Sequence, residues 1–317
     1  MSLVKTLSYG YRAGISVRHW IYDHLIVPEK LTVPVISIGN IVAGGSGKTP
    51  LVHYLASQIG PEKVAILSRG YRRKGKGILR VEAHMSAEEC GDEPLFLAQK
   101  LPKAQVIVGK NRIETGRLME NKGLACLLLD DGMQHRKLHR DCEICVVNQV
   151  DIEQKNFLPY GPLREDPKRL KQVDLVIING AETEELFDRA KQYIRQFSSA
   201  PIAAMNVQVL NAEEVRRKKV AVFSAIASPQ RFYETLKSLG CEVIKKIEKP
   251  DHVAFAPDEL KCLAQTKGIE ALLCTEKDAV KLPKHFTLPL PIIPVQIALA
   301  PTFGNEHIQT IIKRFQT

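Results

Sequence analysis

One short stretch near the N-terminus restricts the fold more than any other part of the 317-residue chain. Residues 33–40, VPVISIGN, form a β-branched apolar run, and IVAGGSGKTPLVHYLASQI follows at once. An apolar strand, a glycine-rich loop and an amphipathic helix, in that order, are typical of a phosphate-binding loop. The order predicts an α/β fold of the P-loop NTPase kind, with a mostly parallel sheet.

The loop itself has the residue types that bind nucleotide phosphates. Its glycines let successive backbone N–H groups turn inward around phosphate oxygens, a conformation that larger side chains obstruct. Lys48 can then reach the β- and γ-phosphates, and the Thr49 hydroxyl lies where it can join a magnesium shell. Val42 occupies the first glycine position of the GxxxxGKS/T pattern, so the loop is atypical. The predicted nucleotide-binding residues in this segment are Gly44, Gly45, Ser46, Gly47, Lys48 and Thr49.

A second acidic element follows another apolar run, LACLLLDDGMQHR at 124–136. Asp130 and Asp131 end this run, as the carboxylates of a Walker B strand do, and Gln134 comes soon after them. Carboxylates at the carboxyl end of a parallel strand beside the P-loop strand can hold magnesium or its waters. Paired aspartates also occur in ordinary turns, but the preceding strand and the following polar cluster favour the functional interpretation.

Two further segments place polar residues after apolar ones. VAILSRGYRRKGKG (64–77) is a strand that runs into a basic loop, in which Arg69 can meet phosphates, although a solvated loop is the alternative. In CGDEPLFLAQKL (90–101), Asp92 precedes a helix. Asp92 could accept the proton of an attacking hydroxyl, or it could cap the helix through backbone N–H groups. Spacing alone favours the cap.

Composition limits the partners and the cellular setting. A hydrophobic fraction of 44% with 25% charged residues describes a globular chain and excludes extensive disorder. The formal net charge of +10 favours anionic partners. The odd number of cysteines, seven, suits reduced thiols. Cys142 and Cys145 form a single CxxC within a segment typical of a buried strand, so we predict no structural zinc.

The N-terminal region, residues 1–28, leaves two interpretations open. Apolar and aromatic residues recur there near helical spacing, while Lys5, Arg12 and His19 lie seven residues apart and could share another face. The helix could therefore lie on a membrane with its cations at anionic headgroups, or it could pack on its own domain. No window approaches the ~18 apolar residues of a spanning helix, and no signal peptide is recognisable, so we expect a cytoplasmic chain.

The second half of the chain begins a new α/β region. VAVFSAIASPQRFYETLKSLG (220–240) predicts a strand, a turn and a helix. Residues 201–210 and 290–299 are similar apolar segments that could pair as a two-stranded connection, or belong separately to the larger sheets. The expected organisation is a P-loop domain with the amphipathic N-terminal region, a linker strand, a smaller α/β domain, and a return strand with a C-terminal helix, at 1–200, 201–217, 218–289 and 290–317.

Several motifs, taken in order, indicate a family. The chain carries IVAGGSGKTP, ILSRGYRR, GDEP, DDGMQHR, PYGPLRE (159–165), PDH (250–252) and TEKDAVKL (275–282). With them it resembles the tetraacyldisaccharide 4'-kinase family of lipid A synthesis. One departure is Ala225, where we expect glycine, and it puts the local turn there in doubt.

The resemblance implies transfer of the γ-phosphate of ATP to the 4'-hydroxyl of tetraacyldisaccharide 1-phosphate, an acidic glycolipid, to form lipid IVA. It implies ATP and Mg²⁺ as cofactors, and a peripheral position at the cytoplasmic face of the inner membrane. The family's catalytic aspartate falls on Asp92 and its histidine partner on His252, which reverses the preference for a cap at Asp92. The two residues would meet when the domains close. Phosphate stabilisation falls on Lys48 and Arg69, and magnesium binding on Thr49, Asp130, Asp131, Gln134 and Glu165.

Two competing functions share much of this evidence. A P-loop NTPase that acts as a switch or with nucleic acid would share the loop, the acidic strand end and the positive charge. A small-metabolite kinase would lack membrane contact. We expect no nucleic-acid partner, because the basic run RRKGKG (72–77) is short and has no interleaved aromatic residues.

Overall fold

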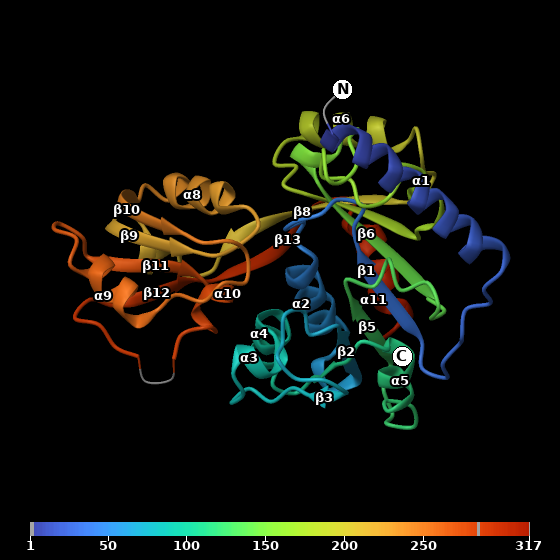
Figure 1. The fold of residues 1–317 in the computed structure, drawn as a ribbon, viewed down its shortest axis with the longest axis horizontal. Coiled ribbons are helices and arrows are strands. Elements are labelled where there is room, and N and C mark those ends of the chain that lie inside the picture. Colours follow the sequence, from blue (N-terminus) through green and yellow to red (C-terminus); the bar gives the residue numbers. More distant parts are fainter. Residues whose placement is uncertain (1–2, 284–285, 317) are drawn as a thin grey trace.

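The computed structural model describes residues 3–283 and 286–316, which form two sheets with their helices (Figure 1). We call the part around the larger sheet the large lobe and the part around the smaller sheet the small lobe. The larger sheet has nine strands. In spatial order they are β13 (Ile297–Phe303), β8 (Ile202–Val209), β7 (Leu175–Asn179), β6 (Cys142–Asn148), β1 (Val35–Gly39), β5 (Cys126–Asp130), β2 (Val64–Ser68), β4 (Gln105–Val108) and β3 (Leu79–Arg80).

The inner strands of this sheet are parallel, and only β13 and β3 run against their neighbours. Their sequences read as continuous apolar runs because helices cover both faces. On one face lie α2 (Lys48–Ile59), α4 (Asp92–Lys100) and α11 (Asn305–Arg314). On the other lie α1 (Leu3–His24), α5 (Arg112–Arg117) and α6 (Glu184–Ile194). The predicted α/β fold with a large, mostly parallel sheet is confirmed.

The small lobe has a four-stranded parallel sheet in the order β10 (Glu242–Glu248), β9 (Lys219–Ser224), β11 (Ala271–Thr275) and β12 (Ile292–Val295). Two separate apolar clusters cover its faces. The helices here are α7 (Ala212–Val215), α8 (Pro229–Ser238), α9 (Pro257–Ala264) and α10 (Glu276–Ala279), while α3 (Ala87–Cys90) precedes α4 in the large lobe. The predicted second α/β unit is therefore present as a sheet of its own.

Two strands connect the lobes. β8 leads out of the large lobe and β13 returns to it, and they pair antiparallel from Ile297↔Val209 to Phe303↔Ala204 (Figure 1). The predicted partner for 201–210 was 290–299, and the structure places the pairing further along the chain. Residues 292–295 pair with β11 in the small sheet instead. The difference arises at Gln296, where the chain leaves one sheet for the other.

The helix α1 has a packed face and an open one. Ile15 is buried in the large lobe, and the Ser8 hydroxyl donates to the Phe157 carbonyl at 2.7 Å. Of the three cations, His19 is turned inward to Glu165, whereas Arg12 lies 3.8 Å from Asp166 and stays half exposed. Leu3, Leu7, Val17, Ile21 and Leu25 share the opposite face and are exposed. None of the described helices is long and apolar enough to cross a membrane.

The CxxC segment is a strand, as its sequence predicts. Cys142 and Cys145 both lie in β6 and are buried. Their side chains belong to the apolar clusters on opposite faces of the sheet, since side chains alternate along a strand. Burial raises the pKa of the Cys145 thiol to about 12. Both cysteines are therefore core residues.

Candidate active site

The phosphate-binding loop lies between β1 and α2, at the carboxyl edge of the large sheet. Gly44 and Gly47 have φ values of 108° and 93°, which only glycine adopts without strain. The amide of Asn179, at the end of β7, donates to the Ser46 carbonyl at 3.1 Å. A Cβ added to Gly47 would come within 2.6 Å of that amide. The loop is thus held from the neighbouring strand ends in a conformation that substitution would disrupt.

Other residues of the loop are held by hydrogen bonds from the protein interior. The Ser46 hydroxyl accepts from the Asn40 side chain at 2.8 Å, so it points into the protein. The amide of Asn148, at the end of β6, lies 3.3 Å from the Gly45 carbonyl. Val42 is buried and bridges to Leu163, so the apolar residue in the first glycine position serves the core. Asn148 and Asn179 were not predicted as site residues, although each ends an apolar run.

The loop lysine meets an aspartate and an arginine. Lys48 Nζ lies 3.5 Å from Asp131 Oδ1, and Arg164 binds both oxygens of that carboxylate, one of them at 3.1 Å. Burial raises the pKa of Asp131, but Lys48 and Arg164 outweigh it and hold that pKa well below its ordinary value. Asp131 therefore stays ionised and positions two cations beside the loop. Arg164 lies in the quoted PLRE motif, but the sequence analysis gave it no role.

Asp130 lies in a different environment from its neighbour. It ends β5 and pairs in register with Ile38 of the P-loop strand, which puts it at the edge where nucleotide would bind. Burial, followed by the nearby charges of Glu93 and Asp131, raises its pKa to about 7. Among the described residues, Asp130 Oδ1 and Gln134 Oε1 are buried oxygens without a hydrogen-bond partner. Unsatisfied oxygens of this kind suit a hard cation, so the residues present fit magnesium.

Glu165 has another partner. Its Oε2 lies 2.6 Å from His19 Nε2, and both side chains are largely buried. Burial raises the pKa of Glu165, but the hydrogen bond with His19 outweighs it and keeps that pKa below its ordinary value. Glu165 thus ties α1 to the segment that contains Arg164. Any magnesium contact from this carboxylate would compete with the histidine.

The aspartate predicted to be catalytic meets the predicted histidine. Asp92 is the first residue of α4, and its side chain is 5% exposed. His252 Nδ1 lies 2.8 Å from both Asp92 oxygens, although the two residues are 160 positions apart. The N-cap position belongs to Gly91, but Asp92 Oδ1 accepts the Glu93 backbone N–H in the first turn at 3.0 Å, so Asp92 contacts the helix start as well as His252.

The basic loop after β2 offers fewer free arginines for phosphate binding than its charge suggests. Arg69 is exposed at the carboxyl end of β2. Arg72 donates to the Asp251 carbonyl at 2.6 Å and Arg73 to the Gly77 carbonyl, so both are occupied. Arg112 of α5 is buried close to Arg69 and the two aspartates, and burial and Arg69 lower its pKa to about 10. The sequence analysis missed this second buried cation.

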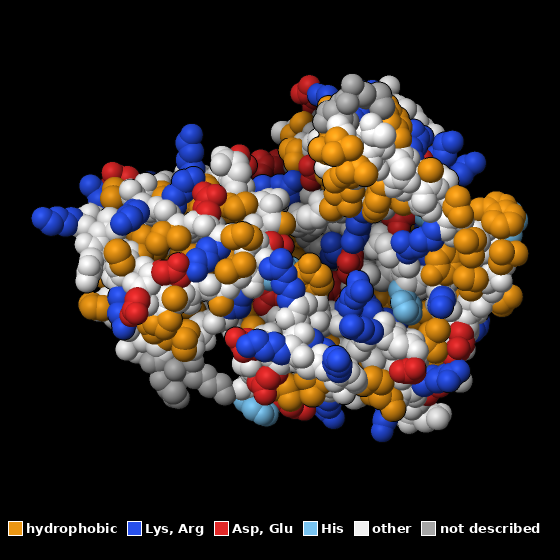
Figure 2. Space-filling view, in the orientation of Figure 1, with side chains coloured by type: hydrophobic (Ala, Val, Ile, Leu, Met, Phe, Trp, Pro, Cys, Tyr) orange, Lys and Arg blue, Asp and Glu red, His pale blue; other side chains and the backbone are white. Residues whose placement is uncertain are grey.

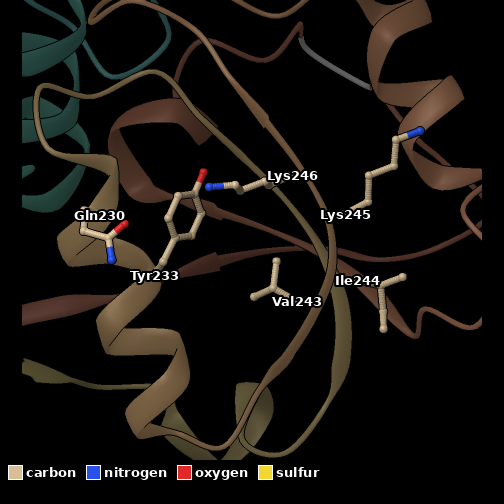
Figure 3. Close-up of a pocket in the computed structure, with 6 residues that line it drawn as sticks. All are labelled: Gln230, Tyr233, Val243, Ile244, Lys245 and Lys246. Atoms are coloured by element: carbon tan, nitrogen blue, oxygen red, sulfur yellow. The ribbon is translucent and has the colours of Figure 1, made fainter.

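A cavity of about 870 Å³ opens between the lobes at the Asp92–His252 pair. The large lobe lines it with Tyr71, Arg72 and Met85, and the small lobe with residues 279–283. A second hollow, of about 370 Å³, lies between α8 and β10 (Figure 3). There Lys246 Nζ lies 4.6 Å from the centre of the Tyr233 ring, and none of the predicted site residues is present. Of the predicted site residues, Asp92 and His252 line the cavity between the lobes.

Ala225 supports His252 without needing a glycine. It directly follows β9, has a φ outside the left-handed region, is buried, and accepts the His252 backbone N–H at 3.2 Å. Its own N–H donates to Asp278 Oδ1 at 3.1 Å. The doubt about the turn at this position is thereby removed.

Comparison with known proteins gives one consistent result. The family described as "Tetraacyldisaccharide-1-P 4'-kinase" matches residues 1–315. The tetraacyldisaccharide 4'-kinase of Chlamydia pneumoniae is 40% identical over 299 residues, covering 86% of this chain and 80% of its own. That of Aquifex aeolicus is 36% identical, covering 87% and 88%. A crystal structure of LpxK from Aquifex aeolicus in complex with ATP superposes with a TM-score of 0.76 and 32% identity, covering 98% of both chains.

Proposed function

The chain belongs to the tetraacyldisaccharide 4'-kinase family, and we propose that it transfers the γ-phosphate of ATP to the 4'-hydroxyl of tetraacyldisaccharide 1-phosphate at the boundary between its lobes. The product would be lipid IVA. The observation that carries the proposal is the Asp92–His252 pair, which opens on the cavity between the lobes while the phosphate-binding loop lies on the same sheet edge.

Asp92 would act on the acceptor. An ionised, buried carboxylate can orient the sugar hydroxyl and take its proton as the oxygen attacks the γ-phosphorus and ADP leaves. His252 would hold that carboxylate by donating from Nδ1, which fixes its direction. The hinge interpretation follows from the same contact, because the two residues belong to different lobes and move apart if the lobes separate.

Residues of the large lobe would bind the phosphates of ATP. The backbone of residues 44–47 can cradle the phosphates, and Lys48 and Arg69 can neutralise charge that develops on the transferred group. Arg164 and Arg112 add positive charge near the same point, held by Asp131 and by burial. Lys48 and Arg164 need little reorganisation because Asp131 already holds them, and Arg112 is held by the Gly109 and Lys110 carbonyls.

Magnesium would be held by Thr49, Asp131 and Asp130, with the oxygen of Gln134 available beside them. The ion would offset the negative charge of the phosphates and fix their orientation. The support is the pair of buried, unpartnered oxygens on Asp130 and Gln134. Glu165 would contribute only by giving up part of its bond with His19.

The exposed face of α1 would rest on the membrane that contains the acceptor, at the cytoplasmic face of the inner membrane. Leu7 is 54% exposed and Val17 59%, on the face that points away from the lobe. Figure 2 shows hydrophobic side chains gathered along this helix. Exposed apolar residues on one face of an amphipathic helix favour the membrane interface.

The decisive experiment measures transfer of labelled γ-phosphate from ATP to tetraacyldisaccharide 1-phosphate in mixed micelles. Wild type should transfer, whereas Lys48→Ala and Asp92→Asn should not. Asp258→Asn is the matched control, because Asp258 is an exposed residue that pairs only with Lys261 among the described residues. Failure of folded wild type to transfer, with ATP still bound, would instead favour a switch NTPase.

Membrane contact is tested separately by co-sedimentation with anionic vesicles. Leu7→Glu with Val17→Glu should release the protein, while Ile244→Glu, at an exposed apolar residue of the small lobe, should not. Point changes are preferable to removal of residues 1–28, because removal would also strip His19 from Glu165. Equal sedimentation of all three proteins would contradict membrane contact through α1.

A further inference from the structure

We propose that Lys277 of α10 is a positioning residue for phosphoryl transfer, the cation that balances the carboxylates around the Asp92–His252 pair and keeps Asp92 ionised and correctly placed. This inference rests on the proposed function, since it assumes that Asp92 acts on the acceptor hydroxyl. Lys277 lies in the TEKDAVKL segment, which the sequence analysis noted without giving this residue a role.

Lys277 meets three carboxylates at once. Its Nζ lies 3.1 Å from Glu93 Oε1, 3.2 Å from Asp251 Oδ1 and 3.9 Å from Asp92 Oδ2. Its side chain is 21% exposed, so solvent screens these contacts only in part. Glu93 and Asp92 belong to the large lobe and Asp251 to the small lobe. One ammonium group therefore joins both lobes at the catalytic carboxylate.

These contacts close a ring with His252. The histidine bonds Asp92 through Nδ1 at 2.8 Å and lies 3.4 Å from Asp251 through Nε2. Lys277 contacts the same two aspartates from another side. Among the described residues, no other lysine or arginine forms an ion pair with Asp92, Glu93 or Asp251. Without Lys277, Asp92 and Asp251 would share only the histidine, and the described residues would offer Glu93 no ion pair.

The remaining charges near Asp92 do not replace Lys277. Lys281 contributes positive charge, but its Nζ is bonded to Asp278 at 2.7 Å. Arg72 bonds the backbone carbonyl of Asp251, leaving the carboxylate of that residue to Lys277 and His252. Burial raises the pKa of Asp92, but the bond from His252 and the charge of Lys277 outweigh it and hold that pKa below its ordinary value.

The helix that carries Lys277 is fixed at both sides. The Thr275 side chain accepts the Asp278 N–H at 3.1 Å and donates to the Asp278 carboxylate at 2.7 Å. Glu276, next to Lys277, forms an ion pair with Lys100 at the far end of α4. Since Glu93 and Lys100 are seven residues apart on α4, both pairs lie along one face of that helix. Lys277 is thus held against Asp92 by a rigid contact.

The test compares the pH dependence of kcat, at saturating ATP and magnesium, for wild type, Lys277→Met and Lys277→Arg. A nearby positive charge lowers a carboxyl pKa, so its removal should move the acidic limb of kcat to higher pH by about one pH unit. On the acidic limb, where Asp92 is partly protonated, kcat should fall by up to about tenfold and recover as the pH rises, with KM for ATP unchanged. Lys277→Arg should restore the wild-type limb. Lys261→Met, at an exposed lysine, is the control.

A second variant keeps the test valid if Lys277→Met does not fold. Asp251→Asn removes one carboxylate that competes for Lys277 and His252, so the acidic limb of kcat should move to lower pH. Added to Lys277→Met, it should return the limb part of the way to its wild-type position. A uniform loss of kcat at every pH, or an unmoved limb in folded Lys277→Met and Asp251→Asn, overturns the proposal. Asp92→Asn and wild type assayed beside them separate the failures: wild-type kcat in Asp92→Asn would overturn the role of Asp92, and no transfer by folded wild type would overturn the proposed function itself.

Discussion

The nucleotide side and the acceptor side of the site are built in opposite ways. Around the phosphate-binding loop, Lys48, Asp131 and Arg164 come from one lobe and hold one another beside neighbouring strand ends. On the acceptor side, Asp92 comes from the large lobe, and His252 and Lys277 from the small lobe. The first half needs only the large sheet to be folded, whereas the second exists only while the lobes are in contact.

This contrast separates binding from transfer. Changes on the nucleotide side should alter ATP binding, and changes on the acceptor side should leave ATP binding intact while they abolish transfer. Each prediction below tests whether the two halves are as independent as their construction suggests, beginning with the largest expected effect.

Replacing the acceptor-side carboxylate should give the largest loss. Asp92→Asn keeps the shape but cannot accept a proton, so kcat should fall about 10²- to 10⁴-fold. The dissociation constant of an ATP analogue, measured by calorimetry, should stay within about twofold of wild type. Lys48→Met is the matched change on the other side and should weaken ATP binding as well. Loss of ATP binding in Asp92→Asn would show that the halves are coupled.

On the nucleotide side, Asp131→Asn should lower kcat about 100-fold, because Lys48 and Arg164 lose the charge that positions them. It should also raise the magnesium concentration needed for half-maximal rate. The pKa of Asp131 lies well below its ordinary value in the folded protein. Its contribution to stability is therefore present above about pH 4 and lost as the pH falls below it.

That pH dependence provides an independent readout. Urea midpoints of wild type should drop between about pH 5 and pH 2, and Asp131→Asn should drop less over this range. Asp258→Asn, at a fully exposed aspartate with one lysine partner among the described residues, should follow wild type. Identical acid profiles for Asp131→Asn and wild type would mean that Asp131 has no effect on stability through Lys48 and Arg164.

The two halves also differ in how far the sequence predicted them. The phosphate-binding loop and Asp130–Asp131 each lie in a continuous sequence motif. The local order of strand, turn and helix fixes their positions, so the motif alone predicts them. His252 could be assigned only through the family resemblance, since no local pattern links it to a residue 160 positions away. Arg164, Asn148 and Lys277 were missed, because their roles depend on which strand ends and lobes come together.

The N-terminal helix illustrates the same limit. Periodicity identified an amphipathic segment, but it could not show which side of the segment would pack. The structure shows His19 turned to Glu165 and Leu7 and Val17 left outside. The partner of His19 comes from the PLRE segment, which enters the arrangement only through the tertiary fold.

The contact between α4 and α10 should stabilise the acceptor side more than the nucleotide side. Glu276 is buried, pairs with Lys100 and accepts the Ile297 N–H at 3.0 Å, at the start of the returning strand. Glu276→Gln should lower the free energy of unfolding by about 1–2 kcal/mol and kcat several-fold, with ATP binding unchanged. A double-mutant cycle with Lys100→Met isolates the ion pair. Zero coupling would mean that the pair does not hold the lobes together.

The smallest expected effect probes a hydrogen bond that the small lobe makes to the phosphate-binding loop. Arg231 of α8 donates to the Gly45 carbonyl at 3.0 Å and to Asp151 at 3.0 Å. Lysine lacks the planar fork that spans the two acceptors. Arg231→Lys should therefore raise KM for ATP about fivefold, as the loss of one hydrogen bond of about 1 kcal/mol predicts, with kcat unchanged.

Arg189→Lys is the control for Arg231→Lys, because Arg189 also makes two hydrogen bonds, both to Glu153, on the surface of the large lobe. An unchanged KM for ATP in Arg231→Lys would mean that the large lobe alone binds the nucleotide, so that the nucleotide side and the acceptor side are fully separate. A fall in kcat would have the opposite meaning. Since the Arg231 guanidinium bonds Gly45 and Asp151, such a fall would indicate that the loop contact helps to set the position of the small lobe, and so of His252.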